Sequence, residues 1–124
     1  MLPHLFGSAR IFVCTKPADM RKSFDGLSGM VQEFLGQDPL AGHLFLFFNK
    51  RRDRAKILLW DRDGFLLVYK RLEAGTFQNL DLTSRTEQLS GSAGLELSVT
   101  DLTLLLSGID LTAARRRKRY SRVS

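Results

Sequence analysis

Cysteine and histidine are scarce in this 124-residue sequence, and their scarcity excludes several kinds of protein. A single cysteine, Cys14, cannot form a disulfide within the chain, so the sequence predicts a reduced, cytoplasmic protein. The two histidines, His4 and His43, stand far apart and lack the spacing of a zinc site. Cys14 lies within an apolar run and is expected to be a small buried hydrophobic residue.

Long apolar runs are also missing. No run approaches the roughly 20 residues that a membrane-spanning helix needs, and the first ten residues lack the basic and then apolar order of a secretory signal. A membrane partner is therefore not expected. The sequence also has no glycine-rich phosphate loop and no dinucleotide fingerprint, so no cofactor and no small-molecule substrate is expected.

Two acids, Asp61 and Asp63, stand close together in the segment "DRDG" at 61–64. A metal site needs more oxygen ligands than these two, whereas an Asp-Gly pair between apolar runs favours a hairpin turn. No catalytic residue and no metal ligand is predicted, and the chain is expected not to be an enzyme.

The spacing of apolar residues predicts an α+β fold. Residues 9–14 are β-branched and aromatic, which is typical of a strand. Apolar residues recur at intervals of three and four over 17–35, which indicates an amphipathic helix that ends at Gly36. The expected fold is a four-stranded, mainly antiparallel sheet packed against this helix, with a short C-terminal helix at 99–107.

Three of the predicted strands form a β-meander at 43–71. They are expected at 43–49, 55–61 and 65–71, with the "DRDG" turn between the last two. Both faces of these strands are apolar, so each face needs a cover. Residues 95–98 are compatible with one more short strand, and the polar residues 74–94 are expected to form a long loop.

The predicted domain organisation is a single α+β domain over 1–110, followed by a basic tail over 111–124. The net charge is +6, and it is unevenly placed. Twelve basic and seven acidic residues lie in 1–72, one basic and six acidic residues lie in 73–110, and six basic residues lie in the tail. Two basic regions separated by an acidic one suggest a polyanionic partner.

The most concentrated positive charge is the link "NKRRDRAK" at 49–56. A solvated hairpin tip would explain one or two lysines, but three arginines also provide planar groups that suit phosphate. In a meander, residues 70–71 lie at the same sheet end as this link, whereas 61–64 lie at the other end. The predicted DNA-binding residues are Lys50, Arg51, Arg52, Arg54, Lys56, Lys70, Arg71, Arg115, Arg116, Arg117, Lys118 and Arg119.

Two long segments carry a family resemblance. The strings "PADMRKSFDGL" (17–27) and "QDPLAGHLFLFFNKRRDRAKILLWDRDGFLLVYKRLEAGTF" (37–77), with a weaker likeness in "LTLLLSGIDL" (102–111), resemble the small TnpB-type accessory proteins of the insertion-sequence sixty-six (IS66) transposon family. The resemblance implies a bacterial mobile element with a separate, larger transposase. It implies no enzymatic activity and no established site residues. Many relatives have tryptophan or proline after the phenylalanine that matches Phe77, whereas Gln78 follows here.

Sequence and resemblance together predict a non-enzymatic accessory factor for transposition, associated with the nucleoid, that binds DNA mainly through phosphates. The alternative is a protein–protein adaptor for the transposase, in which the cations meet acidic protein surfaces. RNA binding that regulates expression of the element is a third hypothesis. The sequence does not separate these three functions.

Overall fold

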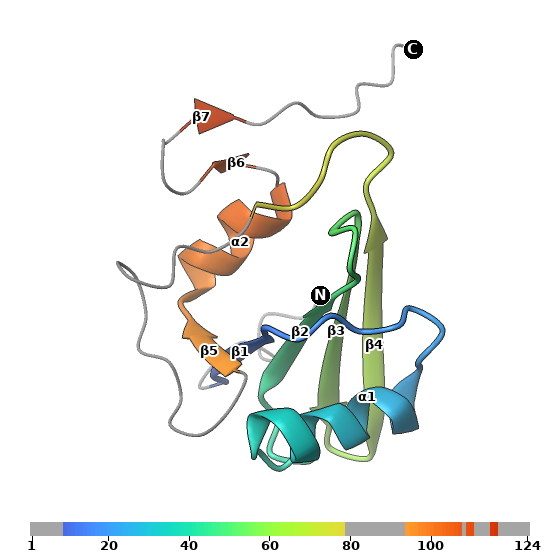
Figure 1. The fold of residues 1–124 in the computed structure, drawn as a ribbon. Coiled ribbons are helices and arrows are strands. Elements are labelled where there is room, and N and C mark those ends of the chain that lie inside the picture. The colour runs from blue at the N-terminus through green and yellow to red at the C-terminus, as the bar shows by residue number, and fades with distance from the viewer. Residues whose placement is uncertain (1–8, 79–93, 108, 111–114, 117–124) are drawn as a thin grey trace.

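The fold is α+β, with a mixed five-stranded sheet between two helical layers (Figure 1). The computed structural model describes residues 9–78, 94–107, 109–110 and 115–116. The sheet contains β1 (Ile11–Cys14), β2 (Leu44–Phe48), β3 (Arg54–Asp61), β4 (Gly64–Arg71) and β5 (Gly94–Leu97). The helices are α1 (Phe24–Met30), its π-helical continuation η2 (Val31–Leu35) and α2 (Val99–Ser107), and a small second sheet pairs β6 (Ile109–Asp110) with β7 (Arg115–Arg116).

The predicted meander is confirmed, but the predicted sheet was too small and too uniform. Strands β2, β3 and β4 pair consecutively and antiparallel. The full strand order is β4-β3-β2-β1-β5, so β5 adds a fifth strand. Strand β1 runs parallel to β2 and antiparallel to β5. The parallel pair follows from the connection, because the helical crossover through α1 and η2 returns the chain to run in the original direction.

The first helix begins later than predicted, at Phe24 instead of residue 17. The preceding segment is held by other contacts. The Ala18 amide donates to the Phe48 carbonyl oxygen at 2.8 Å, and the Asp19 carboxylate accepts a hydrogen bond from the Arg21 amide and pairs with its guanidinium. These contacts fix a turn where periodicity alone indicates a helix. The predicted end is confirmed, since Gly36 adopts the left-handed conformation with φ of 60°.

The C-terminal helix is confirmed as α2. Its first turn is capped by Ser98, whose Oγ accepts a hydrogen bond from the Asp101 amide at 3.0 Å. The hairpin at 61–64 is also confirmed. Asp61 pairs with Gly64 across a two-residue turn, and Arg62 takes the left-handed φ of 57°.

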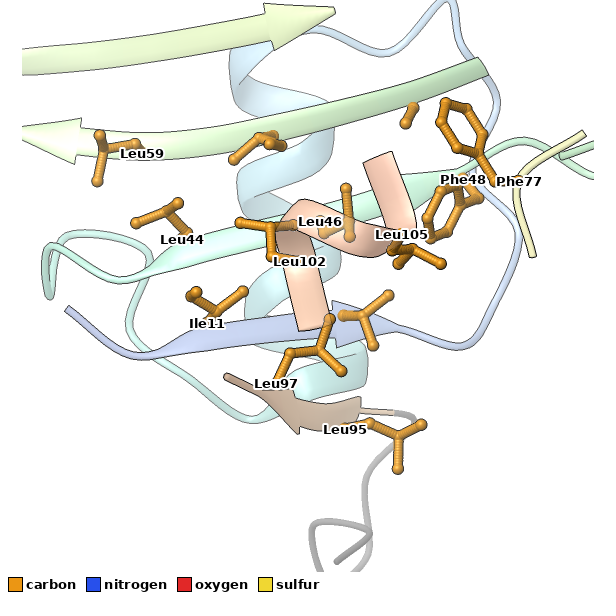
Figure 2. Close-up of a cluster of buried hydrophobic side chains, with 13 residues drawn as sticks. Ile11, Leu44, Leu46, Phe48, Leu59, Phe77, Leu95, Leu97, Leu102 and Leu105 are labelled. Carbon is orange, nitrogen blue, oxygen red and sulfur yellow. The ribbon is translucent and has the colours of Figure 1, made fainter. Parts of the chain in front are cut away.

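Each face of the sheet has its own apolar core. Side chains alternate between the two faces along each strand, so one set packs beneath α1 and η2 and the other beneath α2. In the second set, Leu102 and Leu105 of α2 pack in one cluster with Leu46 of β2 and with Phe77 (Figure 2). Cys14 is buried in the α1-side core, as expected, and burial raises the pKa of its thiol.

Within the described ranges, no helix is long and apolar enough to cross a membrane. Nor do any three histidine, cysteine, aspartate or glutamate side chains of that part of the chain group as metal ligands would.

Candidate nucleic-acid interface

The loop between β2 and β3 is a tight structure organised by Asn49. The Asn49 Oδ1 accepts hydrogen bonds from the amides of Asp53 (3.1 Å) and Arg54 (3.0 Å). Its Nδ2 donates to the Asp53 carboxylate at 2.6 Å, and its carbonyl oxygen accepts from the Arg52 amide. One side chain therefore satisfies much of the loop backbone, and the basic residues project from a fixed frame.

Lys50 and Arg51 form the exposed tip of this loop. Arg54 follows at the start of β3, where its guanidinium donates to the Tyr69 hydroxyl at 3.3 Å. Asp53 lies among these cations, and its pKa is lowered chiefly by the hydrogen bond from Asn49, with Arg51 and Arg54 adding smaller effects. Asp53 therefore stays ionised and neutralises part of the local charge.

Arg52, by contrast, folds back onto the protein. Its guanidinium lies over the Phe48 ring, 4.3 Å from the centroid. It donates hydrogen bonds to the carbonyl oxygens of Phe77 (3.3 Å) and Gln78 (2.7 Å). Arg52 therefore holds the segment after β4 against the loop, and its role is structural.

Lys56 lies inside the molecule, with 6% of its surface exposed. Its Nζ donates to the carbonyl oxygens of Met20 (2.8 Å) and Lys22 (2.7 Å). The same ammonium is 4.7 Å from the centroid of the Tyr69 ring. Lys56 is therefore not part of the exposed surface, contrary to the prediction that it belongs with the loop cations.

The end of β4 brings Lys70 and Arg71 to the same end of the sheet as the loop, as predicted. Strand register sets Arg71 opposite Arg54 and Lys70 opposite Ala55. Arg71 pairs with Glu73 at 2.8 Å, which raises the pKa of its guanidinium. The ammonium of Lys70 donates to the Leu106 carbonyl oxygen at 2.6 Å, near the end of α2 where a cation is favourable.

We call this surface the basic end; it comprises Lys50, Arg51, Arg54, Lys70 and Arg71. Two carboxylates, Asp53 and Glu73, lie among these five cations, so three positive charges are in excess. Like charges placed opposite each other, such as Arg54 and Arg71, destabilise a strand pair. The excess charge therefore favours an anionic partner at this end.

The predicted tail residues are only partly within the described chain. Arg115 and Arg116 form β7, with Arg115 opposite Asp110. Strands β6 and β7 lie beyond the end of α2, at the same end of the molecule as the end of β4 (Figure 1). Arg117, Lys118 and Arg119 lie outside the described residues.

The opposite end of the sheet has a different character. Arg62 lies there on the hairpin turn, with 82% of its side chain exposed and its Nε 3.7 Å from the Asp61 carboxylate. An open hollow of about 340 Å³ adjoins it, lined in part by Leu40 and Trp60. Trp60 packs edge-on against Phe65, 5.0 Å between ring centroids. These contacts are those of a hairpin end, in line with the turn interpretation of Asp61 and Asp63.

Sequence reasoning missed Asn49 and Tyr69, which orient the basic residues. The position of Asn49 at the start of the predicted link weakly indicated its role, because asparagine commonly hydrogen-bonds backbone amides in turns. Lys56 gave a stronger one. It precedes Leu58 by two residues, so in a strand it had to share a sheet face with a core residue.

The sequence is similar to one protein family and to known proteins. A family model described as "IS66 Orf2 like protein" matches residues 9–116. The protein y4jC of Sinorhizobium fredii (strain NBRC 101917 / NGR234) is 34% identical over 117 residues, which cover 93% of each chain. A second protein of the same strain, y4hO, is 35% identical over 103 residues and 83% of each chain. No solved structure matches this chain. The protein therefore belongs to the IS66 Orf2-like family, which ties it to transposition of IS66-type insertion sequences.

Proposed function

We propose that this protein is a non-enzymatic accessory factor in IS66 transposition, and that it binds DNA phosphates through the basic end. The observation that carries the proposal is strand register. It sets Arg54 beside Arg71 and brings Lys70 to the same end as the exposed loop tip. Arginine and lysine side chains of this kind hold a phosphate backbone and carry no base-specific information by themselves.

The cations have different tasks in this proposal. Lys50 and Arg51 are the primary phosphate contacts, because both are exposed at the loop tip. Arg54 and Arg71 contribute guanidinium donors beyond those bonded within the protein, since each group has five N–H donors. Arg52 acts indirectly by fixing the loop through its bonds to the chain at 77–78.

The test measures affinity for duplex DNA across a salt series. Each phosphate neutralised contributes about −0.9 to the slope of log affinity against log salt. The double variant Lys50→Gln/Arg51→Gln should therefore flatten the slope by about two units if each residue neutralises one phosphate. The loss should be equal on element-end DNA and on random DNA of the same length.

Arg62→Gln is the matched control. It removes one exposed arginine at the opposite end of the sheet, and it should leave the salt slope unchanged. A similar flattening in Arg62→Gln would show that net charge, and not the basic end, governs binding. A loss confined to element-end DNA would show that the loop reaches base edges.

The adaptor function is the second candidate, and exposed apolar side chains favour it. Phe24 and Leu40 are 42% and 50% exposed on the surface of the domain, and apolar residues of this kind contribute to protein interfaces. In that case Lys50→Gln/Arg51→Gln would reduce transposition while the salt slope for DNA stayed the same. Equal binding to RNA and DNA of one length would instead favour the regulatory function.

A further inference from the structure

Strand β4 forms an open edge of the sheet. Within the part of the chain that the structure describes, its one paired neighbour is β3, and all eight β4 residues stay in register with that strand. Strand β4 lies at the margin of the sheet, and the segment between β1 and α1 crosses in front of it in this view (Figure 1). Proteins commonly protect such an edge with a charge, a proline or a bulge near its middle. Residues 65–69, "FLLVY", contain none of these.

The apolar side chains of this edge remain partly in water. Leu66 and Val68 lie on the α2 side of the sheet and are each 40% exposed. The buried cluster beneath α2 draws on the other strands and contains no β4 residue (Figure 2). On the α1 side, Tyr69 is 49% exposed. A long edge with apolar residues on both faces is suited to adding another strand.

The geometry points to a second copy of this chain as that strand. We propose that β4 pairs antiparallel with β4 of the partner subunit, centred on Leu67. Each sheet contributes five strands, so the pair forms one continuous sheet of ten. The proposed seam shares Arg71 with the basic end but leaves the loop tip free, and the proposal does not depend on DNA binding.

Strand geometry restricts the possible registers. Opposed residues in a sheet share a face, so Leu66 and Val68 must oppose residues of their own face. The two-residue turn makes Asp61 and Gly64 a hydrogen-bonded pair, and such pairs alternate along the ladder. The free backbone groups on the outer side of β4 consequently belong to residues 65, 67, 69 and 71. Registers centred on residue 66, 67 or 68 satisfy both conditions.

Charge selects the middle register. Centring on Leu67 sets Arg71 opposite the partner's Asp63, and Lys70 opposite the partner's Gly64. All positions between oppose apolar to apolar or aromatic to aromatic residues. A centre at Leu66 would set Arg71 opposite the partner's Asp61, but it would also place Lys70 against the partner's Arg62 and Tyr69 against the partner's Asp63. A centre at Val68 would place Lys70 against the partner's Leu66 and Arg71 against the partner's Phe65. Opposite charges stabilise a cross-strand pair and like charges destabilise it.

Arg71 can make this contact while it keeps its bond to Glu73. Its Nη2 donates to the Glu73 carboxylate at 2.8 Å. A guanidinium has five N–H donors, which is enough to bond two carboxylates. Asp63 is exposed on the hairpin turn. The two charged pairs of the dimer flank an apolar centre, which is the usual arrangement of a polar rim around an interface core.

The first experiment measures mass by light scattering after size exclusion, at protein concentrations in the tens of micromolar. The wild-type protein is expected at twice its chain mass. Val68→Lys places a charge on the exposed edge and should give the monomer mass with an unchanged circular dichroism spectrum. A monomeric wild-type protein, or a dimer that Val68→Lys leaves intact, would overturn the proposal.

A charge exchange tests the paired ends. Asp63→Arg should weaken the dimer by about tenfold, because it sets two arginines against each other at both ends of the seam. The double variant Asp63→Arg/Arg71→Asp should restore it. Glu33→Arg is the matched control, with the same change of charge at an exposed helical position, and should leave dimerisation as in wild type. Equal weakening by Glu33→Arg, or no restoration in the double variant, would contradict this register.

Cross-linking tests the register independently of stability. Residue 66 opposes the partner's residue 68 as a non-hydrogen-bonded pair, with a Cα separation of about 4.5 Å, within the range of a disulfide. A mixture of Leu66→Cys and Val68→Cys proteins should oxidise to a covalent dimer, and either protein alone should not. Cross-linking of Leu66→Cys alone would instead show a register centred on Leu66, and no cross-link in the mixture would overturn the pairing.

Discussion

Arg52 and Phe77 bind each other through their backbones and through one side chain. The Phe77 amide donates to the Arg52 carbonyl oxygen at 2.7 Å, and the Arg52 Nε donates back to the Phe77 carbonyl oxygen at 3.3 Å. The Phe77 ring is buried, and its centroid is 5.2 Å from the centroid of the Phe48 ring. The Arg52 guanidinium lies over the same Phe48 ring. An arginine from the most basic loop of the protein thus anchors a core phenylalanine.

Arg52→Ala should lower the free energy of unfolding by about 1–3 kcal/mol, because two partly buried carbonyl oxygens lose their donor. Arg52→Gly should be less harmful, since Arg52 has a φ of 59° that glycine adopts without strain. Urea unfolding measures both. Arg51→Ala is the control and should stay within about 0.5 kcal/mol of wild type. A stable Arg52→Ala protein with a flattened salt slope for DNA would show that Arg52 contacts phosphate instead.

Lys56→Met should destabilise the segment before α1. Methionine keeps the length of the side chain but leaves the Met20 and Lys22 carbonyl oxygens without their donor, at a cost of about 1–3 kcal/mol. Hydrogen exchange should quicken over residues 19–24 more than over β2. If stability is unchanged and affinity for DNA falls, the Lys56 ammonium contacts DNA and does not serve the buried carbonyl oxygens.

Asp19 should contribute stability that depends on pH. The hydrogen bonds from the Arg21 side chain and amide lower the pKa of Asp19 from 3.8 to about 2. A carboxylate whose folded pKa is lowered stabilises the fold above its unfolded pKa, and this contribution is lost as the pH falls toward the folded pKa. Thermal unfolding of wild type and Asp19→Asn should therefore differ above about pH 4 and converge near pH 2. A difference that stays constant down to pH 2 would contradict this assignment.

Ser98→Ala should lower stability by about 1 kcal/mol, because the Asp101 amide at the start of α2 loses its cap. Ser98→Asp should retain most of the stability, since a carboxylate also caps a helix and favours its positive end. Thermal unfolding measures both variants. Equal destabilisation by alanine and aspartate would show that the Ser98 hydroxyl stabilises the protein through a contact other than the helix cap.

Deletion of residues 117–124 tests the part of the tail that follows β7. The deletion removes four basic residues, Arg117, Lys118, Arg119 and Arg122. Affinity for DNA should fall on any sequence, and the salt slope should flatten by about 0.9 for each phosphate that these residues neutralise in the full chain. Thermal stability should stay the same. Unfolding or aggregation of the shortened protein would show that these residues support the domain.

The sequence alone was sufficient for the local elements that depend on neighbours along the chain. Two apolar runs around Asp-Gly predict a hairpin, and the runs on either side of the basic link predict the rest of the meander. Gly36 and Ser98 mark helix boundaries by their own conformational and hydrogen-bonding preferences. The shared end of the 49–55 link and residues 70–71 followed directly, because antiparallel strands reverse direction at each turn.

Tertiary structure decided which strands became neighbours and which cations stayed exposed. The pattern of β1 holds no information about its partners, so its parallel pairing with β2 and the addition of β5 depended on the crossover and the packing of both faces. Periodicity likewise began the first helix too early, because the segment before Phe24 is held by contacts with distant strands, the Ala18 amide bonding to Phe48 and the Met20 and Lys22 carbonyl oxygens to Lys56. Arg52 and Arg51 are adjacent and chemically identical, yet one lies on Phe48 and the other in solvent. Arg52 differs from Arg51 in its left-handed backbone and in its bond to Phe77, which is 25 residues away along the chain. Only folding brings Arg52 and Phe77 into contact.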